Sequence, residues 1–320
     1  MISIDDIKLA QARLRGVAVR TPLILWPGGQ ADRRLYLKPE SLQPVGAFKL
    51  RGAYNKIASL SEAERRRGVV AFSSGNHAQG VAYAARALGV RATIVMPEAA
   101  PRIKRDRTAA LGAQIDLVTG GGEEQWRARA ETLARENGYV MVAPFNDEAV
   151  IAGQATVGLE ILEDLPEVET ILAPVGGGGL LSGVAAAVKL SRPGVRVIGV
   201  EPDLANDAQI SFRRGQVVEL PLDQTRRTIA DGMRATRIGD ITFAYIRAFA
   251  DDMLTVTEEE IREATRRLIL EARLVAEPSG AVALAAFLFH QQELPDARCT
   301  VAVVSGGNIA PETLREILAD

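Results

Sequence analysis

Short apolar segments rich in valine and isoleucine recur along the chain, and each ends in a Gly-, Pro- or Ser-rich turn before an alanine-rich stretch. Strands that are apolar on both faces and alternate with helices are typical of parallel sheets covered by helices on both sides. The pattern therefore predicts an α/β fold with open, mostly parallel sheets flanked by helices. No repeat or linker-like tract interrupts it, so if there are two domains we expect them to be interleaved. The segments are GVVAFSSGN, ATIVMP, QIDLV, YVMVAPF, TILAPVGGGG, VRVIGVEP and CTVAVVSGGN.

Composition limits the classes of function. The 320-residue chain has a formal net charge of -2, so it lacks the basic excess expected of a protein that binds nucleic acid or an acidic membrane surface. Its single cysteine, Cys299, excludes an intrachain disulfide and favours a reducing, cytoplasmic setting. Two histidines, His77 and His290, are too few for a histidine-rich zinc site. The N-terminal segment has helical spacing and early acidic residues, so we expect part of the fold and no signal peptide.

The run Gly176–Gly179 is the strongest candidate for a binding site. It follows an apolar strand and precedes a helix, so several backbone N–H groups can converge on an anion with no Cβ between them. This context favours phosphate binding. The kind of phosphate stays open, because Glu201 lies at roughly the distance expected for the ribose contact of a dinucleotide fold. A triphosphate is disfavoured, because no Lys-Ser/Thr pair closes the glycine run.

A second polar turn, FSSGNHAQG, combines Ser73, Ser74, Asn76 and His77 after a strand and before a helix. Side-chain donors and backbone N–H groups that point the same way suit a carboxylate. A third turn, VVSGGN, ends another apolar strand but carries little weight on its own.

Lys49 stands beside Phe48 between the predicted strand RLYLKPE and the predicted helix LRGAYNKIASL. Desolvation disfavours the ammonium form and yields the neutral amine that attacks a carbonyl. A phosphate cradle, a carboxylate cradle and a desolvated lysine together predict pyridoxal phosphate and an amino-acid substrate. The neighbouring Arg51 and Lys56 are interpreted as ordinary helix residues.

With these features assembled, the sequence resembles the fold-type II pyridoxal-phosphate enzymes, specifically the threonine/serine dehydratase and serine racemase group. The resemblance covers nearly the whole chain and depends on nine motifs in the order found in that family. They are GAFKLRGA, SSGNHAQG, VIAGQ, PVGGGGLLSG, GVEP, TIADGM, TVTEEEI, AEPSGAV and SGGN.

The resemblance implies roles for individual residues. Lys49 would hold the cofactor covalently and act as the base at the substrate Cα, and Ser74 would be the acid/base on the opposite face in a racemase. The other implied cofactor contacts are Phe48 beside the ring, Asn76 at its 3′-oxygen, Gly176, Gly177, Gly178, Gly179 and Leu180 at the phosphate, and Ser305 at the pyridine nitrogen. The implied substrate-carboxylate contacts are Ser73, Ser74, Asn76 and His77. Glu201, Ala205 and Asp207 match the stretch that binds magnesium or calcium in that group.

The resemblance also implies a tryptophan-synthase-beta-like architecture with two interleaved domains. Residues 1–67 and 146–320 would form a large cofactor-binding domain, and residues 68–145 a small mobile domain that closes over substrate. The implied activity is a dehydratase (ammonia-lyase) that converts a 3-hydroxy amino acid of the threonine or serine type to a 2-oxo acid and ammonia. A homodimer is expected from the same resemblance.

Several alternatives stay open. On the same scaffold the chain could be an amino-acid racemase, a hydroxyectoine-pathway dehydratase or a 3-hydroxyaspartate dehydratase. The loop RATRIG, which places Arg234 and Arg237 near the expected mouth of the site, could favour a second carboxylate or could simply be surface. From other classes, a Rossmann dinucleotide-binding protein and a non-catalytic cofactor-binding sensor remain.

Overall fold

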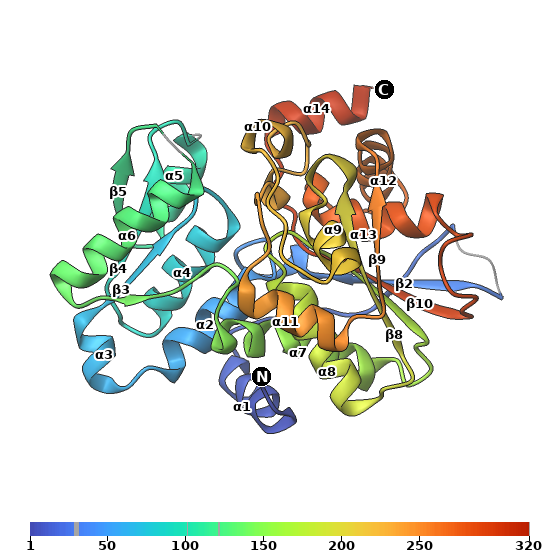
Figure 1. The fold of residues 1–320 in the computed structure, drawn as a ribbon, viewed down its shortest axis with the longest axis horizontal. Coiled ribbons are helices and arrows are strands. Elements are labelled where there is room, and N and C mark those ends of the chain that lie inside the picture. The colour runs from blue at the N-terminus through green and yellow to red at the C-terminus, as the bar shows by residue number, and fades with distance from the viewer. Residues whose placement is uncertain (29–31, 101, 121, 320) are drawn as a thin grey trace.

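Two sheets form the centres of two lobes in this computed structural model, which describes residues 1–28, 32–100, 102–120 and 122–319 (Figure 1). The larger sheet has six strands in the order β1-β2-β10-β7-β8-β9, and all neighbouring pairs are parallel except β1 with β2. The strands are β1 (Ile24–Leu25), β2 (Arg34–Pro39), β7 (Thr170–Pro174), β8 (Arg196–Pro202), β9 (Asp252–Val256) and β10 (Cys299–Val304).

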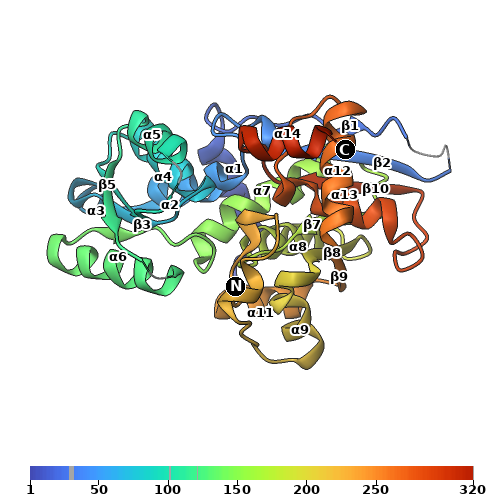
Figure 2. The same ribbon diagram turned by 90° about the horizontal axis from the view of Figure 1, so that it is seen from above.

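Helices cover both faces of this sheet because its central strands are apolar on both sides. Successive residues of β7, Ile171 and Leu172, enter different core clusters on opposite faces. Helices α12 and α13 pack on the Leu172 side, and α7 and α8 pack on the Ile171 side (Figure 2). The helices of this lobe are α1 (Ile4–Leu14), α7 (Glu148–Asp164), α8 (Gly179–Ser191), α9 (Asp207–Arg214), α10 (Leu222–Thr225), α11 (Asp240–Phe249), α12 (Glu258–Leu270), α13 (Pro278–Phe289) and α14 (Pro311–Ala319), with short 3-10 turns η1 (Glu40–Leu42), η2 (Asp203–Ala205) and η3 (Asp231–Met233).

The smaller sheet has four parallel strands in the order β5-β4-β3-β6. Helix α2 joins the two lobes, because it contacts α4 of the smaller lobe and α7 of the larger one. The strands are β3 (Val69–Phe72), β4 (Ala92–Pro97), β5 (Gln114–Val118) and β6 (Val140–Met141), and the helices are α2 (Lys49–Ser59), α3 (Glu62–Arg67), α4 (Asn76–Ala87), α5 (Arg102–Ala110) and α6 (Glu123–Asn137).

The predicted fold class is confirmed, and all seven apolar segments contain strands, although YVMVAPF contributes only the two residues of β6. The apolar-run criterion missed β1 and β9. Strand β1 is two residues long, and β9 is an edge strand whose first residue, Asp252, is charged. Cys299 lies buried at the start of β10. No helix in the described parts of the chain is both long enough and apolar enough to span a lipid bilayer.

Candidate active site

A cavity of about 890 Å³ lies between the lobes and draws its walls from both. The carboxyl ends of β3, β7 and β10 and the first residues of α2 meet there, which is where parallel sheets position ligands. Every residue that the sequence assigned to cofactor or substrate lines this cavity. These residues are Phe48, Lys49, Ser73, Ser74, Asn76, His77, Gly176, Gly177, Gly178, Gly179, Leu180 and Ser305.

Lys49 is the first residue of α2 and its ammonium lies between two aromatic rings. Its Nζ donates to the carbonyl oxygen of Pro144 at 2.6 Å and lies 5.2 Å from the ring centre of Phe48 and 6.0 Å from that of Phe145. Burial lowers the pKa of Lys49 from 10.5 to about 8, against a smaller opposing effect of the Glu123 charge. The neutral amine is therefore much more available than in an exposed lysine.

The turn between β7 and α8 requires glycine, because its backbone conformation and its close neighbours leave no room for a Cβ. Gly178 is the N-cap of α8 and has a left-handed φ of +90°, a conformation that L side chains rarely adopt. A Cβ on Gly177 would lie 2.2 Å from the ring of Phe145, and one on Gly176 would lie 3.2 Å from the Cα of Met233. The turn therefore leaves the first N–H groups of a 13-residue helix facing the cavity, as an anion site requires.

Asn76, the first residue of α4, is held from both sides. Its Nδ2 donates to Oε1 of Glu277 at 2.5 Å, and its Oδ1 accepts from Nδ2 of Asn308 at 2.8 Å. Burial and the charge of Asp231 raise the pKa of Glu277 to about 7, while the bond from Asn76 and the charge of Lys104 oppose that rise. The amide is thus fixed in the cavity wall beside a carboxyl that titrates near neutrality.

The carboxylate cradle is formed by a serine turn and an uncapped helix. Ser73 Oγ accepts from the backbone N–H of Gly75 at 3.1 Å, and no side chain caps α4, so the first N–H groups of that helix remain available to an anion. Ser305 lies across the cavity at the end of β10, where its hydroxyl donates to the carbonyl oxygen of Ser279 at 3.2 Å.

His77 is placed in the cavity wall as a neutral ring. Its Nε2 lies 2.8 Å from the carbonyl oxygen of Val142 and must donate to it, which leaves Nδ1 as an acceptor that has no hydrogen-bond partner among the described residues. Burial and the charge of Lys49 lower the pKa of His77 to about 3. In this tautomer His77 cannot donate to a substrate carboxylate, so we transfer that expected role to Ser73, Ser74 and the α4 N–H groups.

The three predicted metal ligands lie away from the cavity, around the start of α9. Glu201 is the last residue but one of β8 and accepts from the N–H groups of Ala208 and Gln209 at 3.2 and 2.7 Å. Both carboxylate oxygens of buried Asp207 have no hydrogen-bond partner among the described residues. Burial raises the pKa of Asp207 to about 7, and burial together with the Asp207 charge raises that of Glu201. Ala205 is fully buried beside them at the end of η2.

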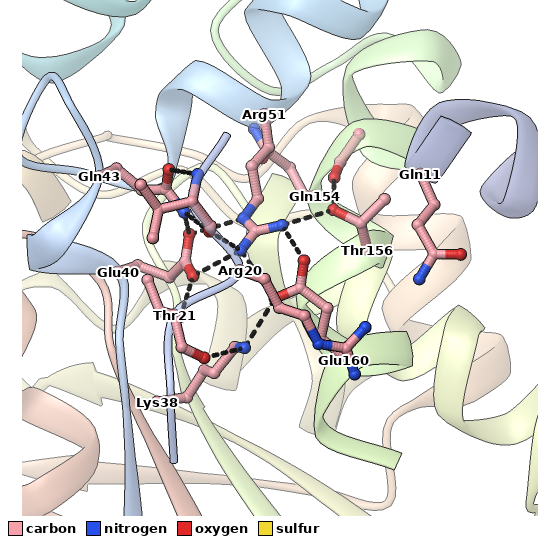
Figure 3. A network of polar contacts seen from close by, with 12 residues as sticks. Gln11, Arg20, Thr21, Lys38, Glu40, Gln43, Arg51, Gln154, Thr156 and Glu160 are labelled. Atoms are coloured by element: carbon pink, nitrogen blue, oxygen red, sulfur yellow. Dashed lines mark hydrogen bonds and ion pairs between the residues drawn. The ribbon is translucent and has the colours of Figure 1, made fainter. Parts of the chain in front are cut away.

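The interpretation of Arg51 as an ordinary helix residue is wrong. Its guanidinium is only 1% exposed and forms ion pairs with Glu40 at 2.7 Å and Glu160 at 2.6 Å (Figure 3). Glu160 also binds Lys38 at 2.6 Å, and the side chain of Thr156 accepts from Arg51 at 3.1 Å. We call Lys38, Glu40, Arg51 and Glu160 the buried ionic network; Arg51 follows Lys49 by two residues in α2.

Glu277 and Phe145 are among the cavity residues that were not recognised in the sequence. Glu277 belongs to the quoted motif AEPSGAV, but nothing local shows that its carboxyl meets Asn76, which is 201 residues away. Phe145 follows the short strand β6 in an irregular segment, and only its packing against Gly177 and Lys49 reveals its place.

Comparison with known proteins confirms the resemblance seen in the motifs. The sequence profile described as "Pyridoxal-phosphate dependent enzyme" matches residues 14–306. The chain is 46% identical over 324 residues to an L-threonine ammonia-lyase of Thermotoga maritima, with 99% of this chain and 78% of that protein covered. It is 39% identical over 311 residues to the L-threonine dehydratase catabolic TdcB of Escherichia coli, with 96% and 93% covered. Its structure matches that of maize serine racemase with a TM-score of 0.93 at 37% identity, over 99% of this chain and 97% of the other.

Proposed function

Because the chain belongs to the pyridoxal-phosphate-dependent enzyme family, we propose that it is a lyase that converts a 3-hydroxy amino acid of the threonine or serine type to a 2-oxo acid and ammonia. The observation that carries this proposal is the lysine of lowered pKa, Lys49, in one cavity with the glycine turn and the serine turn. The two relatives named as threonine ammonia-lyase and threonine dehydratase support the choice of substrate class.

The side chains of the cavity fit the cofactor. The turn Gly176–Gly179 is a cradle that a Cβ would fill, Phe48 and Phe145 offer apolar faces, and Ser305 offers a neutral hydroxyl. A neutral hydroxyl suits a pyridine nitrogen that is not fully protonated, which fits β-elimination. We assign the covalent attachment to Lys49, the ring contact to Phe48, the 3′-oxygen contact to Asn76, the phosphate contact to Gly176–Gly179 with Leu180, and the ring-nitrogen contact to Ser305.

When bound, the cofactor supplies an electron-withdrawing ring that stabilises negative charge at the substrate Cα. The protein's own residues orient the substrate and transfer protons. Ser73, Ser74 and the first turn of α4 hold the carboxylate, so that the Cα–H bond faces Lys49. Once the amino group of the substrate has displaced it from the cofactor, the amine of Lys49 would take the Cα proton. The β-hydroxyl would leave as water, and the proton it needs balances the one taken from Cα. Hydrolysis of the resulting enamine consumes one water and releases ammonia and the 2-oxo acid.

A metal ion is part of the proposal. Glu201 and Asp207 are buried carboxylates with no ion-pair partner among the described residues, and the oxygens of Asp207 have no hydrogen-bond partner there. They offer the hard donors that magnesium or calcium prefers. We assign Glu201, Asp207 and the carbonyl of Ala205 as its ligands. Among the described residues no three His, Cys, Asp or Glu side chains form a metal cluster, so carbonyl and water oxygens would complete the shell.

Magnesium or calcium is expected to raise the melting temperature and a chelator to lower it. Asp207→Asn should abolish this response and the exposed control Asp223→Asn should keep it; no response in the unmodified protein would refute the assignment.

We further assign residues 1–67 and 146–320 to a large cofactor-binding domain and residues 68–145 to a small mobile domain. The protein is proposed to act as a cytoplasmic homodimer on a small-molecule amino acid, with no nucleic-acid or membrane partner. The near-neutral charge supports the lack of a nucleic-acid or membrane partner, and the single cysteine supports the cytoplasmic setting.

Amino-acid racemisation is the second candidate, and one observation favours it. Ser74 lines the same cavity as Lys49, so its hydroxyl is available to return a proton to the other face of Cα, and maize serine racemase shares the fold at 37% identity. The two activities differ in product. Formation of the D-isomer without 2-oxo acid would replace the lyase proposal with racemisation.

The test of the proposed function is spectroscopic and chemical. Purified protein loaded with pyridoxal phosphate should show the visible absorption of a lysine-bound cofactor and should form 2-oxo acid and ammonia from L-threonine or L-serine. Lys49→Ala should lose both, whereas Lys56→Ala, which removes only an ion pair with Asp147, should keep both. A band that survives in Lys49→Ala would refute the attachment site, and NAD binding without any cofactor band would favour the dinucleotide alternative.

A further inference from the structure

One carboxylate in the cavity wall has no hydrogen-bond or ion-pair partner among the described residues. Glu123 is the first residue of α6 and lines the cavity from the smaller lobe. The cation one turn along its helix, Arg127, pairs instead with Glu131 at 3.8 Å. A carboxylate that faces a cavity and binds no group of its own protein can accept a hydrogen bond or a charge from a ligand.

The charges of Glu123 and Lys49 act on each other across the cavity. The carboxylate opposes the fall in the pKa of Lys49, and Lys49 opposes the rise that burial causes in the pKa of Glu123. Glu123 is exposed and lines the same cavity as the reacting amine, so it can contact the side chain of a substrate held there. Trp126 of α6 lines the same wall, and its indole Nε1 is buried with no hydrogen-bond partner among the described residues.

Several other charged side chains of the cavity form hydrogen bonds or ion pairs with other residues of the protein. Lys104 binds Asp231 at 2.7 Å, Glu277 accepts from Asn76, and Arg234 donates twice to the carbonyl oxygen of Thr228 at 3.0 and 2.7 Å. Arg237, the second arginine of the loop that suggested a second carboxylate, pairs with Asp240 at 2.5 Å. The arginines of this loop therefore favour an acidic substrate less than the sequence indicated.

We propose that Glu123 determines side-chain specificity by selecting a cationic side chain, so that 3-hydroxy amino acids with a terminal amino group are preferred over those with a second carboxylate. This inference depends on the proposed lyase function. The ammonium of such a side chain can donate a hydrogen bond to the carboxylate of Glu123, which has no partner of its own among the described residues. The cavity of about 890 Å³ lies near the upper end of ordinary small-molecule pockets, so it has room for such a chain.

The experiment compares three substrates that differ in side-chain charge. The holoenzyme is given L-threonine, 3-hydroxyaspartate and 2,4-diamino-3-hydroxybutyrate, and kcat/KM is measured for each by 2-oxo acid formation. The expected order is cationic, then neutral, then anionic. Glu123→Gln should lower the ratio of cationic to anionic kcat/KM by about tenfold or more, since a unit charge in a partly screened cavity has at least that effect. Glu124→Gln, the adjacent residue outside the cavity wall, is the matched control and should leave the ratio unchanged.

A binding measurement separates this inference from the proposed function. Unreactive 2,4-diaminobutyrate and aspartate are titrated while Trp126 fluorescence is followed, with Trp126→Phe used to assign the signal. Tighter binding of the diamino acid that is lost in Glu123→Gln supports the inference even if no substrate is dehydrated, in which case only the lyase proposal fails. Preference of the unmodified enzyme for 3-hydroxyaspartate, or an unchanged charge preference in Glu123→Gln, would overturn the inference while leaving the lyase proposal standing.

Discussion

At the scale of single residues, Glu277 combines deep burial with a hydrogen bond to a proposed cofactor ligand. Its side chain is 3% exposed, and its pKa is raised from 4.5 to about 7 by burial and by Asp231. A carboxyl whose pKa is higher in the folded state binds more protons folded than unfolded between these two values. The free energy of unfolding that depends on Glu277 therefore falls as the pH rises through this window.

Glu277→Gln should remove this pH dependence. The amide oxygen still accepts from Asn76, but the side chain no longer ionises, so the variant should gain stability relative to the unmodified protein as the pH rises from 5 to 8. The expected relative gain is on the order of 3 kcal/mol, from a pKa difference worth about 1.4 kcal/mol per unit. Urea unfolding at both pH values measures it. An equal stability difference at pH 5 and pH 8 would show that Glu277 does not titrate in this range.

A second prediction at this scale concerns the substitution Gly177→Ala. In Gly177→Ala the new Cβ would meet the Phe145 ring at 2.2 Å, so either the glycine turn or the ring must move. Overpacking of this kind costs roughly 1–3 kcal/mol. We expect pyridoxal phosphate to bind about tenfold more weakly, as measured by cofactor titration. Gly194→Ala is the matched control, because nothing lies within 4 Å of the Cβ it would add; equal effects of the two substitutions would count against a crowded turn.

At the scale of secondary-structure elements, the buried ionic network fastens four of them together. Lys38 comes from β2, Glu40 from η1, Arg51 from α2 and Glu160 from α7. Burial alone would raise the pKa of Glu40, but the charges of Arg51 and Lys38 bring it below its ordinary value. The network thus fixes the helix that begins with Lys49 against the larger lobe.

Arg51→Met should destabilise the protein by about 3–5 kcal/mol, because it leaves two buried carboxylates short of a cation. Lys56→Met on the same helix breaks a partly exposed pair with Asp147 and should cost no more than about 1 kcal/mol. Urea denaturation midpoints of both variants test the contrast. If Arg51→Met costs no more than the control, the network does not hold α2 in place.

The sequence predicted those features whose pattern is complete within a few neighbouring residues, and it did not predict contacts between residues far apart in the chain. Runs of valine and isoleucine predicted the central strands, and adjacent motif residues predicted the cavity turns, because both patterns are complete within a few residues. Arg51 could not be interpreted in this way, because its partner Glu160 lies 109 residues away. Nothing in the sequence around Glu123 shows that the fold places it in the wall of the cavity that also holds Lys49.

At the scale of the whole molecule, an ion pair spans the cavity between the lobes. Lys104 of α5 binds Asp231 of η3 at 2.7 Å, with the two side chains 20% and 40% exposed. Such a pair is weak by itself, but it joins the smaller lobe to the segment that packs against the glycine turn. It therefore favours the closed arrangement in which the cavity is shielded from water.

Lys104→Ala should raise KM for the amino-acid substrate by about two- to fivefold, because a partly exposed ion pair contributes a free energy of about that size. The fall in kcat should be smaller than the rise in KM. Steady-state kinetics of the holoenzyme measure both constants. Lys8→Ala, on the exposed surface of α1, serves as the control. A KM that matches the control would mean that this pair does not contribute to closure.

Because Cys299 is buried, its reaction with a thiol reagent can report large openings of the molecule. This thiol is the only one in the chain, is 1% exposed, and lies at the start of β10, between β2 and β7. Burial also raises its pKa, which further suppresses the reactive thiolate. A thiol reagent should therefore modify the protein only when the central sheet separates, so the labelling rate measures how often that happens. For the same reason, one cysteine introduced on each lobe could carry a dye pair, and distance changes between the lobes could be followed in a single molecule during turnover.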